Sequence, residues 1–166
     1  MNIADEWSII NASANSIPVQ IETIPISLNV QLRYAYLEEE LSGMIENNGQ
    51  FFTITVNAND WDLRQRFTLA HELGHYMLHR HLIGNGLDDD RAYRSTKGGR
   101  YHNIAIGPTE EAEANRFAAN LLMPINQMKA YKDNSVVVEQ LADKFQVSNR
   151  AMEIRLTNLK IPFRTR

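Results

Sequence analysis

The sequence predicts an α+β fold in which a small, mostly antiparallel sheet comes first and helices follow. Residues 17–56 contain short runs of alternating apolar and polar side chains, the pattern of strands with one buried face. Residues 61–80 and 109–124 instead repeat their apolar side chains at helical spacing. Residues 135–166 carry a further helical pattern that breaks once near its middle. We therefore expect a sheet, two long helices and a C-terminal helical pair.

Composition and charge limit the classes of protein to which the chain can belong. Its 166 residues suit one domain, or one domain with a small appendage, and 43% of them are hydrophobic, which is enough for a real core. The formal net charge of −3 gives no basic field that would favour direct nucleic-acid binding. The chain has no cysteine, which excludes disulfides and thiolate metal ligands.

The sequence shows no signal peptide, and no run approaches the ~18 apolar residues of a membrane span. We therefore expect a cytoplasmic location without membrane contact.

The first part of the chain is expected to form the sheet and a helix that covers it. Residues 1–14 predict a short helix, and residues 17–21 and 28–32 predict two strands. Residues 42–56 predict a hairpin with Asn47-Asn48-Gly49 at its turn, because Asn-Gly supplies the positive φ values that a tight turn requires. The hairpin leads directly into the helix expected over residues 61–80.

This helix carries the most informative motif of the chain. Residues 71–75 read His-Glu-Leu-Gly-His, and His71 and His75 lie one helical turn apart on the same face. Two imidazoles so placed can bind one Zn²⁺ ion, while Glu72 lies beside the open side of the ion. A carboxylate in that position can take a proton from a metal-bound water. The alternative interpretation is a helix with two ordinary histidines.

A catalytic zinc site needs a third protein ligand, and the helix over residues 109–124 can supply it. Glu111 lies on the apolar face of that helix, and we assign it as the third ligand. Asn115 follows one turn later and is expected to orient a ligand from the second shell of the metal. Glu113 lies on the other side of the helix and is expected to be a solvated charge, and Glu110 is a less favoured ligand.

These two helices resemble a known family. The motif at residues 71–75 is followed by Glu-Ala-Glu-Ala-Asn-Arg-Phe-Ala at 111–118 and by Leu-Leu-Met-Pro at 121–124. This combination is similar to the ImmA/IrrE family of bacterial metallo-endopeptidases. The resemblance implies a minimal zincin-like, gluzincin-type core with Zn²⁺. It also implies cleavage of a protein partner, often a helix-turn-helix repressor encoded nearby.

Two further features of such a peptidase can be sought in the sequence. In gluzincins an edge strand beside the metal helix receives the substrate as an added strand, and our candidate is one of the hairpin strands within residues 42–56. The irregular segment 81–108 is long for a passive connection and is expected to form a lid or a substrate wall. Tyr101 and His102, near its end, are candidate donors to the developing oxyanion. Other possible donors are Tyr76, His79 and Tyr93.

The C-terminal pattern predicts two short helices with Ser148 as the N-cap of the second. It resembles a helix-turn-helix unit, but we expect the pair to pack on the core or dock a partner rather than bind DNA. We accordingly divide the chain into a metallopeptidase domain, residues 1–134, and a helical pair packed on it, residues 135–166.

The predicted function is zinc-dependent endopeptidase acting on one specific protein, a helix-turn-helix repressor or a similar regulator. The alternative is a regulatory binding module of the toxin–antitoxin type, which sequesters its partner with little or no proteolysis. A third possibility, a DNA-binding regulator, would show strongly salt-dependent binding to duplex DNA through residues 135–160.

Overall fold

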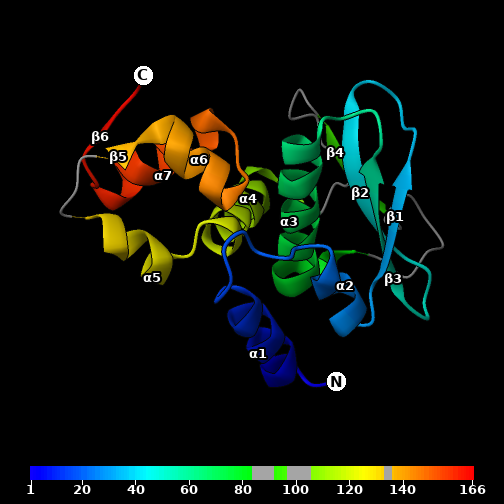
Figure 1. Ribbon diagram of the computed structural model, residues 1–166. Helices are drawn as coiled ribbons and strands as arrows, with labels where there is room; N and C mark the ends of the chain where they lie inside the picture. The colour runs from blue at the N-terminus through cyan, green and yellow to red at the C-terminus, as the bar shows by residue number, and fades with distance from the viewer. Residues whose placement is uncertain (84–91, 97–105, 133–135) are drawn as a thin grey trace.

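The computed structural model describes residues 1–83, 92–96, 106–132 and 136–166. It confirms the α+β fold. In Figure 1 the sheet lies beside helix α3 (Asp62–His79), and the C-terminal helices α6 (Val138–Phe145) and α7 (Asn149–Leu159) lie on the other side of the molecule. Helix α4 (Pro108–Leu122) is seen between the two parts and packs against α3.

The sheet has four strands in the order β1-β3-β2-β4. Strand β3 runs parallel to β1 and antiparallel to β2, and β2 runs antiparallel to β4. The expectation of a mostly antiparallel sheet is therefore confirmed. The strands are β1 (Gln31–Ala35), β2 (Leu41–Asn47), β3 (Phe52–Asn57) and β4 (Ala92–Thr96).

The predicted hairpin is present, but its turn is longer than expected. Asn47 pairs with Phe52, so residues 48–51 form the loop, and Gly49 has a φ of 88°. Asn48 organises this loop because its side-chain Oδ1 accepts hydrogen bonds from the backbone N–H groups of Gln50 and Phe51. A tight type I′ turn needs two residues with positive φ, whereas within this loop only Gly49 has a positive φ.

The prediction of a strand over residues 17–21 is wrong. Val19 and Ile21 are fully buried, but they are anchored by turns that lead into α2 (Thr23–Ser27). The carbonyl of Val19 accepts a hydrogen bond from Arg66 Nη2 at 2.9 Å instead of one from a neighbouring strand. The alternation of apolar and polar residues correctly predicts which side chains enter the core. It does not require a strand, because an irregular segment can bury alternate side chains too. The second predicted strand, 28–32, begins later than expected, at Gln31.

Strand β4 lies within the segment that was expected to be irregular, residues 81–108. It pairs with β2, and β3 covers the other side of β2. Neither hairpin strand is therefore an edge, which makes our candidate for the substrate-receiving strand wrong. Among the strands that the structure describes, β1 and β4 form the two edges.

The N-terminal helix α1 (Ile3–Ser13) confirms the prediction for residues 1–14 and is joined to α3 by a buried polar cluster. Glu6, which is 4% exposed, accepts hydrogen bonds from both outer nitrogens of Arg80, each at 2.8 Å. The hydroxyl of Tyr76 donates to the same carboxylate at 2.9 Å. This cluster fastens α1 to the end of α3.

The two predicted C-terminal helices are α6 and α7, and Ser148 caps α7 by accepting a hydrogen bond from the N–H of Ala151 at 3.1 Å. Arg155 on α7 donates through Nε and Nη2 to the backbone oxygen of Met123, at 3.0 and 2.8 Å. The division at residue 134/135 stays a prediction, although one hydrophobic core contains residues from both sides of it. The remaining short elements are the 3₁₀ turns η1 (Arg80–Leu82) and η3 (Lys129–Tyr131), helix α5 (Ile125–Met128), and strands β5 (Val136–Val137) and β6 (Phe163–Arg164).

Within the described part of the chain, every helix is too short or too polar to cross a bilayer.

Candidate metal centre

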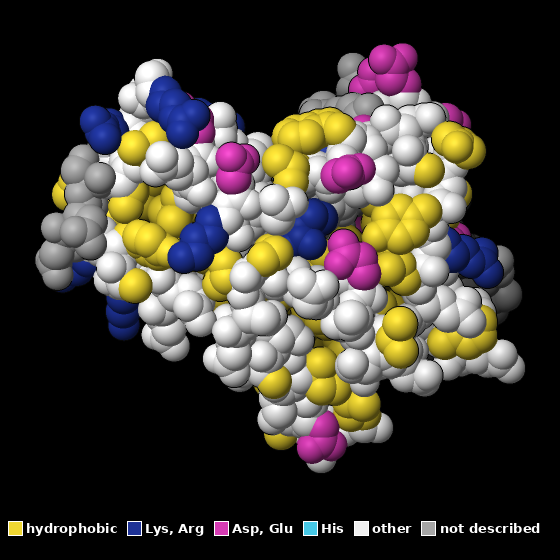
Figure 2. Space-filling view, viewed as in Figure 1, with side chains coloured by type: hydrophobic (Ala, Val, Ile, Leu, Met, Phe, Trp, Pro, Cys, Tyr) yellow, Lys and Arg dark blue, Asp and Glu magenta, His cyan; other side chains and the backbone are white. Residues whose placement is uncertain are grey.

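The motif residues lie in the middle of α3, where the helix is covered by the sheet on one side and by α4 on the other. His71 is 5% exposed, and Glu72 and His75 are fully buried. Burying three such side chains is costly unless they are paired or bind a cation. Among the residues that the structure describes, no histidine side chain is visible on the face of the molecule shown in Figure 2.

Two helices bring three metal-ligating side chains together. Nε2 of His75 lies 3.0 Å from Oε1 of Glu111, and Nε2 of His71 lies 3.6 Å from the same oxygen. The two Nε2 atoms are 3.0 Å apart. Ligand bonds of about 2.0–2.2 Å in a tetrahedral site place neighbouring ligand atoms roughly 3.3 Å apart. The cluster of His71, His75 and Glu111 therefore has the spacing and the donor set to bind a metal ion.

His71 is oriented by a residue of the opposite helix. Its Nδ1 lies 3.0 Å from Oδ1 of Asn115 on α4. Since an amide oxygen only accepts, Nδ1 of His71 carries the proton and donates it, which leaves the Nε2 lone pair for a metal. The sequence placed Asn115 near the ligands, and the structure shows that its contact is with His71.

His75 is held by a chain of two further side chains. Its Nδ1 lies 3.1 Å from Nδ1 of His79, and Nε2 of His79 lies 2.9 Å from Oε2 of Glu113. If His75 offers Nε2 to a metal, its Nδ1–H donates to His79, and His79 must then donate through Nε2–H to Glu113. This series of hydrogen bonds thus fixes the tautomer of His75 and that of His79.

This contact corrects the prediction for Glu113, which is more than a solvated charge. Its side chain is 47% exposed, but one carboxylate oxygen accepts from a histidine that is 4% exposed. The helical-wheel argument considered only the faces of α4 and could not show that His79 of α3 lies opposite. The spacing of His79, one turn after His75, was the available signal.

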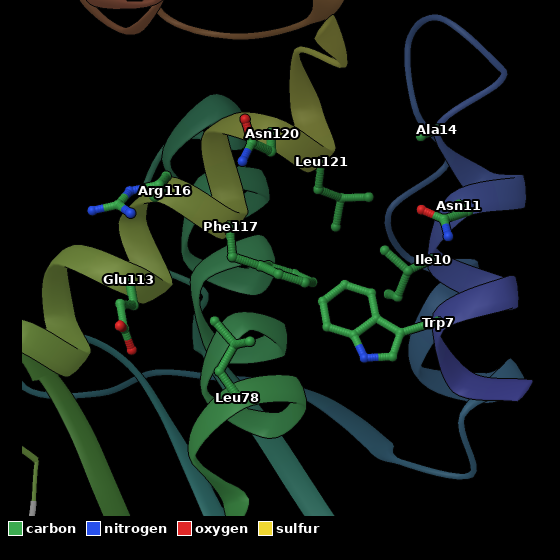
Figure 3. A pocket seen from close by; sticks show the side chains of 10 residues that line it. All are labelled: Trp7, Ile10, Asn11, Ala14, Leu78, Glu113, Arg116, Phe117, Asn120 and Leu121. Carbon is green, nitrogen blue, oxygen red and sulfur yellow. The ribbon is translucent and has the colours of Figure 1, made fainter. Parts of the chain in front are cut away.

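Glu113 also lines a cavity of about 400 Å³ between α1, α3 and α4. Figure 3 shows its carboxylate on α4 near Leu78, on the far side of Phe117 from Trp7. The aromatic rings of Trp7 and Phe117 pack edge to face with their centroids 6.0 Å apart. The chain from His75 through His79 therefore ends at the wall of a cavity.

The two candidate histidine ligands differ in their titration. Burial lowers the pKa of His75 to about 4, so this ring is neutral at physiological pH. Burial acts in the same direction on the pKa of His71, but hydrogen bonding to Glu111 and the charges of Glu72 and Glu111 outweigh it and raise that pKa. A neutral imidazole is the form that binds a metal, and His75 is already in that form.

The side chain of Glu72 lies between α3 and strand β2. A Cβ atom on Gly43 of β2 would lie 3.5 Å from Oε1 of Glu72 and only 2.5 Å from the Cγ2 methyl of Thr68. A larger residue at position 43 would therefore displace the α3 face that carries Glu72. Sequence reasoning missed Gly43, since a glycine inside a strand also occurs for other reasons.

Nothing in the described part of the chain supports any of the candidate oxyanion donors. Tyr101 and His102 lie outside them, as does the side chain of Tyr93. Tyr76 donates its hydroxyl to Glu6, and His79 is engaged by His75 and Glu113. The less favoured ligand Glu110 instead accepts a hydrogen bond at 2.8 Å from the backbone N–H of Gly107 and so caps α4.

A family model described as Peptidase_M78, IrrE N-terminal-like domain, matches residues 26–157. The chain belongs to this family. The match confirms the resemblance to ImmA/IrrE proteins and extends it from the two ligand-bearing helices to β1 and to most of α7. Membership and the His71–His75–Glu111 cluster together indicate a metallopeptidase.

A solved structure with a similar fold is that of a Mycobacterium tuberculosis transcriptional regulator, with a TM-score of 0.56 and 13% sequence identity to this M78-family chain. The match covers 92% of this chain and 46% of the regulator, so the chain spans about half of the length of that protein. The likeness therefore concerns the fold alone. No curated protein matches the chain in sequence.

Proposed function

We propose that this M78-family chain is a zinc-dependent endopeptidase. The observation that carries the proposal is the convergence of His71, His75 and Glu111 from two helices, with Glu72 next to His71 in the sequence and fully buried. A purely structural histidine pair would not need a carboxylate from a second helix at hydrogen-bond distance. The family supports hydrolysis of a peptide bond as the reaction.

In this mechanism His71, His75 and Glu111 would hold Zn²⁺. A bound zinc ion would polarise the scissile carbonyl and lower the pKa of a water molecule. Glu72 would serve as the general base toward water and would return the proton to the leaving amine. By contacting Nδ1 of each imidazole, Asn115 and His79 keep the Nε2 atoms of His71 and His75 directed toward Glu111.

The proposed substrate is one specific protein, a helix-turn-helix repressor or a similar regulator, in the cytoplasm. The resemblance to the ImmA/IrrE family supports this choice. The fold likeness to a transcriptional regulator is also compatible with the alternative, a regulatory module that sequesters a partner with little or no proteolysis.

A Glu72→Gln variant separates the two functions. The product of the adjacent gene is co-purified with this variant and then incubated with zinc-loaded wild-type protein, and fragments are measured by mass spectrometry. We expect the variant to keep the partner and zinc but to cleave about 10²–10⁴-fold more slowly, because the general base is lost. Glu40→Gln, which changes an exposed carboxylate elsewhere, serves as the control.

Equal cleavage by wild type and Glu72→Gln would contradict the peptidase mechanism. Unchanged biological activity of the Glu72→Gln variant would support the binding module instead.

A further inference from the structure

A groove of about 710 Å³ lies between the start of α3, the exposed side of α4, and α7. We call it the α3–α7 groove. Arginines and apolar side chains line it together. They include Arg64, Arg150 and Arg155, and Trp61, Phe67 and Ile154. Neither the ligand cluster nor Glu72 lines it, so the groove is a separate feature of the surface.

The groove is cationic. Arg64, Arg116, Arg150 and Arg155 line it, and the lining residues that the structure describes include no aspartate or glutamate. Of the four, Arg150 has an acidic neighbour, Glu153, at 3.5 Å, but the side chain of Arg150 is 79% exposed. Such an exposed pair leaves most of the positive charge available.

The most informative of these cations is Arg155, which is 8% exposed. It donates to the backbone oxygen of Met123, and no carboxylate in the described part of the chain forms an ion pair with it. Burial accordingly lowers its pKa. A buried charge that faces a backbone carbonyl at the end of α4 rather than a carboxylate keeps part of its desolvation cost, and an anion in the groove would reduce that cost.

Arg64 has the same character to a smaller degree. It donates through Nη2 to the hydroxyl of Ser42 at 2.9 Å, whereas its buried Nε has no hydrogen-bond partner among the described residues. Two guanidinium groups that lack a carboxylate therefore line the same groove.

The groove also exposes apolar side chains. Trp61 is 59% exposed and Ile154 is 47% exposed. Aromatic side chains and arginines are the residue types that dominate protein–protein recognition. The occupant must therefore offer apolar groups together with negative charge, which suits a polypeptide better than a phosphate backbone.

The groove adjoins the metal centre through residues of α4. Asn115 lines the groove, and its Oδ1 accepts the hydrogen bond from Nδ1 of His71. Ala112, the neighbour of Glu111 in α4, also lines it. A chain segment seated in the groove would lie next to the residues that hold His71.

We propose that the α3–α7 groove binds an acidic, partly apolar segment of the protein substrate and thereby brings the substrate to the metal centre. The inference rests on the proposed function, because it names the substrate class of that site. The carboxylates of the segment engage the exposed Arg150 and, deeper in the groove, Arg155 and Arg64. Its apolar side chains cover Trp61 and Ile154.

The first test measures binding to the full-length, zinc-loaded Glu72→Gln variant. The probe is a short fluorescent peptide of Glu, Asp, Leu and Phe, and the matched probe carries Gln or Asn at every acidic position. We expect only the acidic peptide to bind. Adding Arg150→Glu should weaken its binding roughly three- to tenfold, whereas Lys129→Glu, an exposed cation outside the groove, should change it less than about twofold.

Equal binding of the two peptides, or unchanged binding after Arg150→Glu, would overturn the inference. So would displacement of the acidic peptide by duplex DNA at a lower concentration than by unlabelled peptide. Because Arg150 is exposed, the Arg150→Glu change does not disturb the core, and circular dichroism checks that the variant is folded.

The second test separates this inference from the proposed function. Wild-type protein is given a mixture of peptides from a cell extract, and the cleaved sequences are identified by mass spectrometry. Cleavage that depends on Glu72 but shows no enrichment of acidic residues near the cut would overturn the proposed role of the groove. The peptidase proposal would stand. Acidic-peptide binding that depends on Arg150, together with no cleavage of the co-purified partner by zinc-loaded wild-type protein, would overturn the peptidase and leave a binding groove.

Discussion

Replacing Gly74 with alanine should weaken both the fold and the metal centre, because α3 and α4 meet at this residue. A Cβ atom at position 74 would lie 3.1 Å from both the Cα and the backbone oxygen of Ala114, and 3.2 Å from Cδ1 of Phe117. Two of these three atoms belong to the α4 backbone and cannot move by a rotamer change. The helices must therefore separate by a few tenths of an ångström.

The expected magnitude follows from two opposing effects. Alanine is favoured over glycine inside a helix by about 1 kcal/mol. Overpacking of a close contact typically costs about 1–3 kcal/mol, and the fixed backbone at this contact places Gly74→Ala toward the upper end. The free energy of unfolding should therefore fall by about 1–2 kcal/mol. Glu111 lies one turn before Ala114, so the same displacement draws its carboxylate away from His75.

Denaturant unfolding of the zinc-free protein measures the first effect, and competition with a chromophoric chelator measures zinc affinity. Gly107→Ala is the control, since a Cβ there would meet only Oε2 of Glu110 at 3.4 Å and leave the α3–α4 contact intact. A Gly74→Ala protein that is as stable as the wild type and binds zinc equally well would refute the reasoning. It would show that the two helices have more room than the structure gives them.

Three further results are expected. His79→Asn should weaken zinc binding about 10–100-fold in the chelator assay, and Glu113→Gln should cost less than Glu113→Ala because an amide oxygen still accepts from Nε2–H of His79; equal loss in both Glu113 variants would contradict the tautomer assignment. The hydrogen bond from Arg80 lowers the pKa of Glu6 below its ordinary value of 4.5, so this carboxylate stabilises the fold above that pH and the contribution is lost as the pH falls through the lowered pKa. Glu6→Gln should cost about 1.5–3 kcal/mol at pH 7 and flatten the acid limb of melting temperature against pH, and an unchanged acid limb would refute this assignment. Removing zinc with a chelator should lower the melting temperature by an amount that grows with the zinc concentration used for loading, with about 2.7 kcal/mol expected at 100 times the dissociation constant; a melting temperature independent of zinc would argue against the site.

The sequence predicted the ligand-bearing helices well because their apolar side chains recur at helical spacing over several turns. The same regularity placed Glu111 on the face of α4 that meets α3, and the structure brings it to His75. The helical pair α6–α7 was predictable for the same reason, helped by the N-cap Ser148. Long periodic segments leave few alternative structures.

The missed features depend on contacts between distant segments. Strand β4 reads Ala-Tyr-Arg-Ser-Thr, which has no apolar alternation, and it becomes visible only through its pairing with β2. Val19 and Ile21 alternate as a strand would, yet they enter the core from turns. The contact of Glu113 with His79 joins two helices whose mutual rotation no single-helix argument supplies.

The grip of Arg155 on Met123 has a mechanical consequence. Met123 ends the helix that bears Glu111, and the guanidinium from α7 holds its carbonyl oxygen, where a helix end favours positive charge. Helix α7 therefore holds in place the helix that supplies the Glu111 ligand. Removing the C-terminal segment would release the end of α4, so a chain truncated before α6 would lose support for Glu111 as well as the two helices.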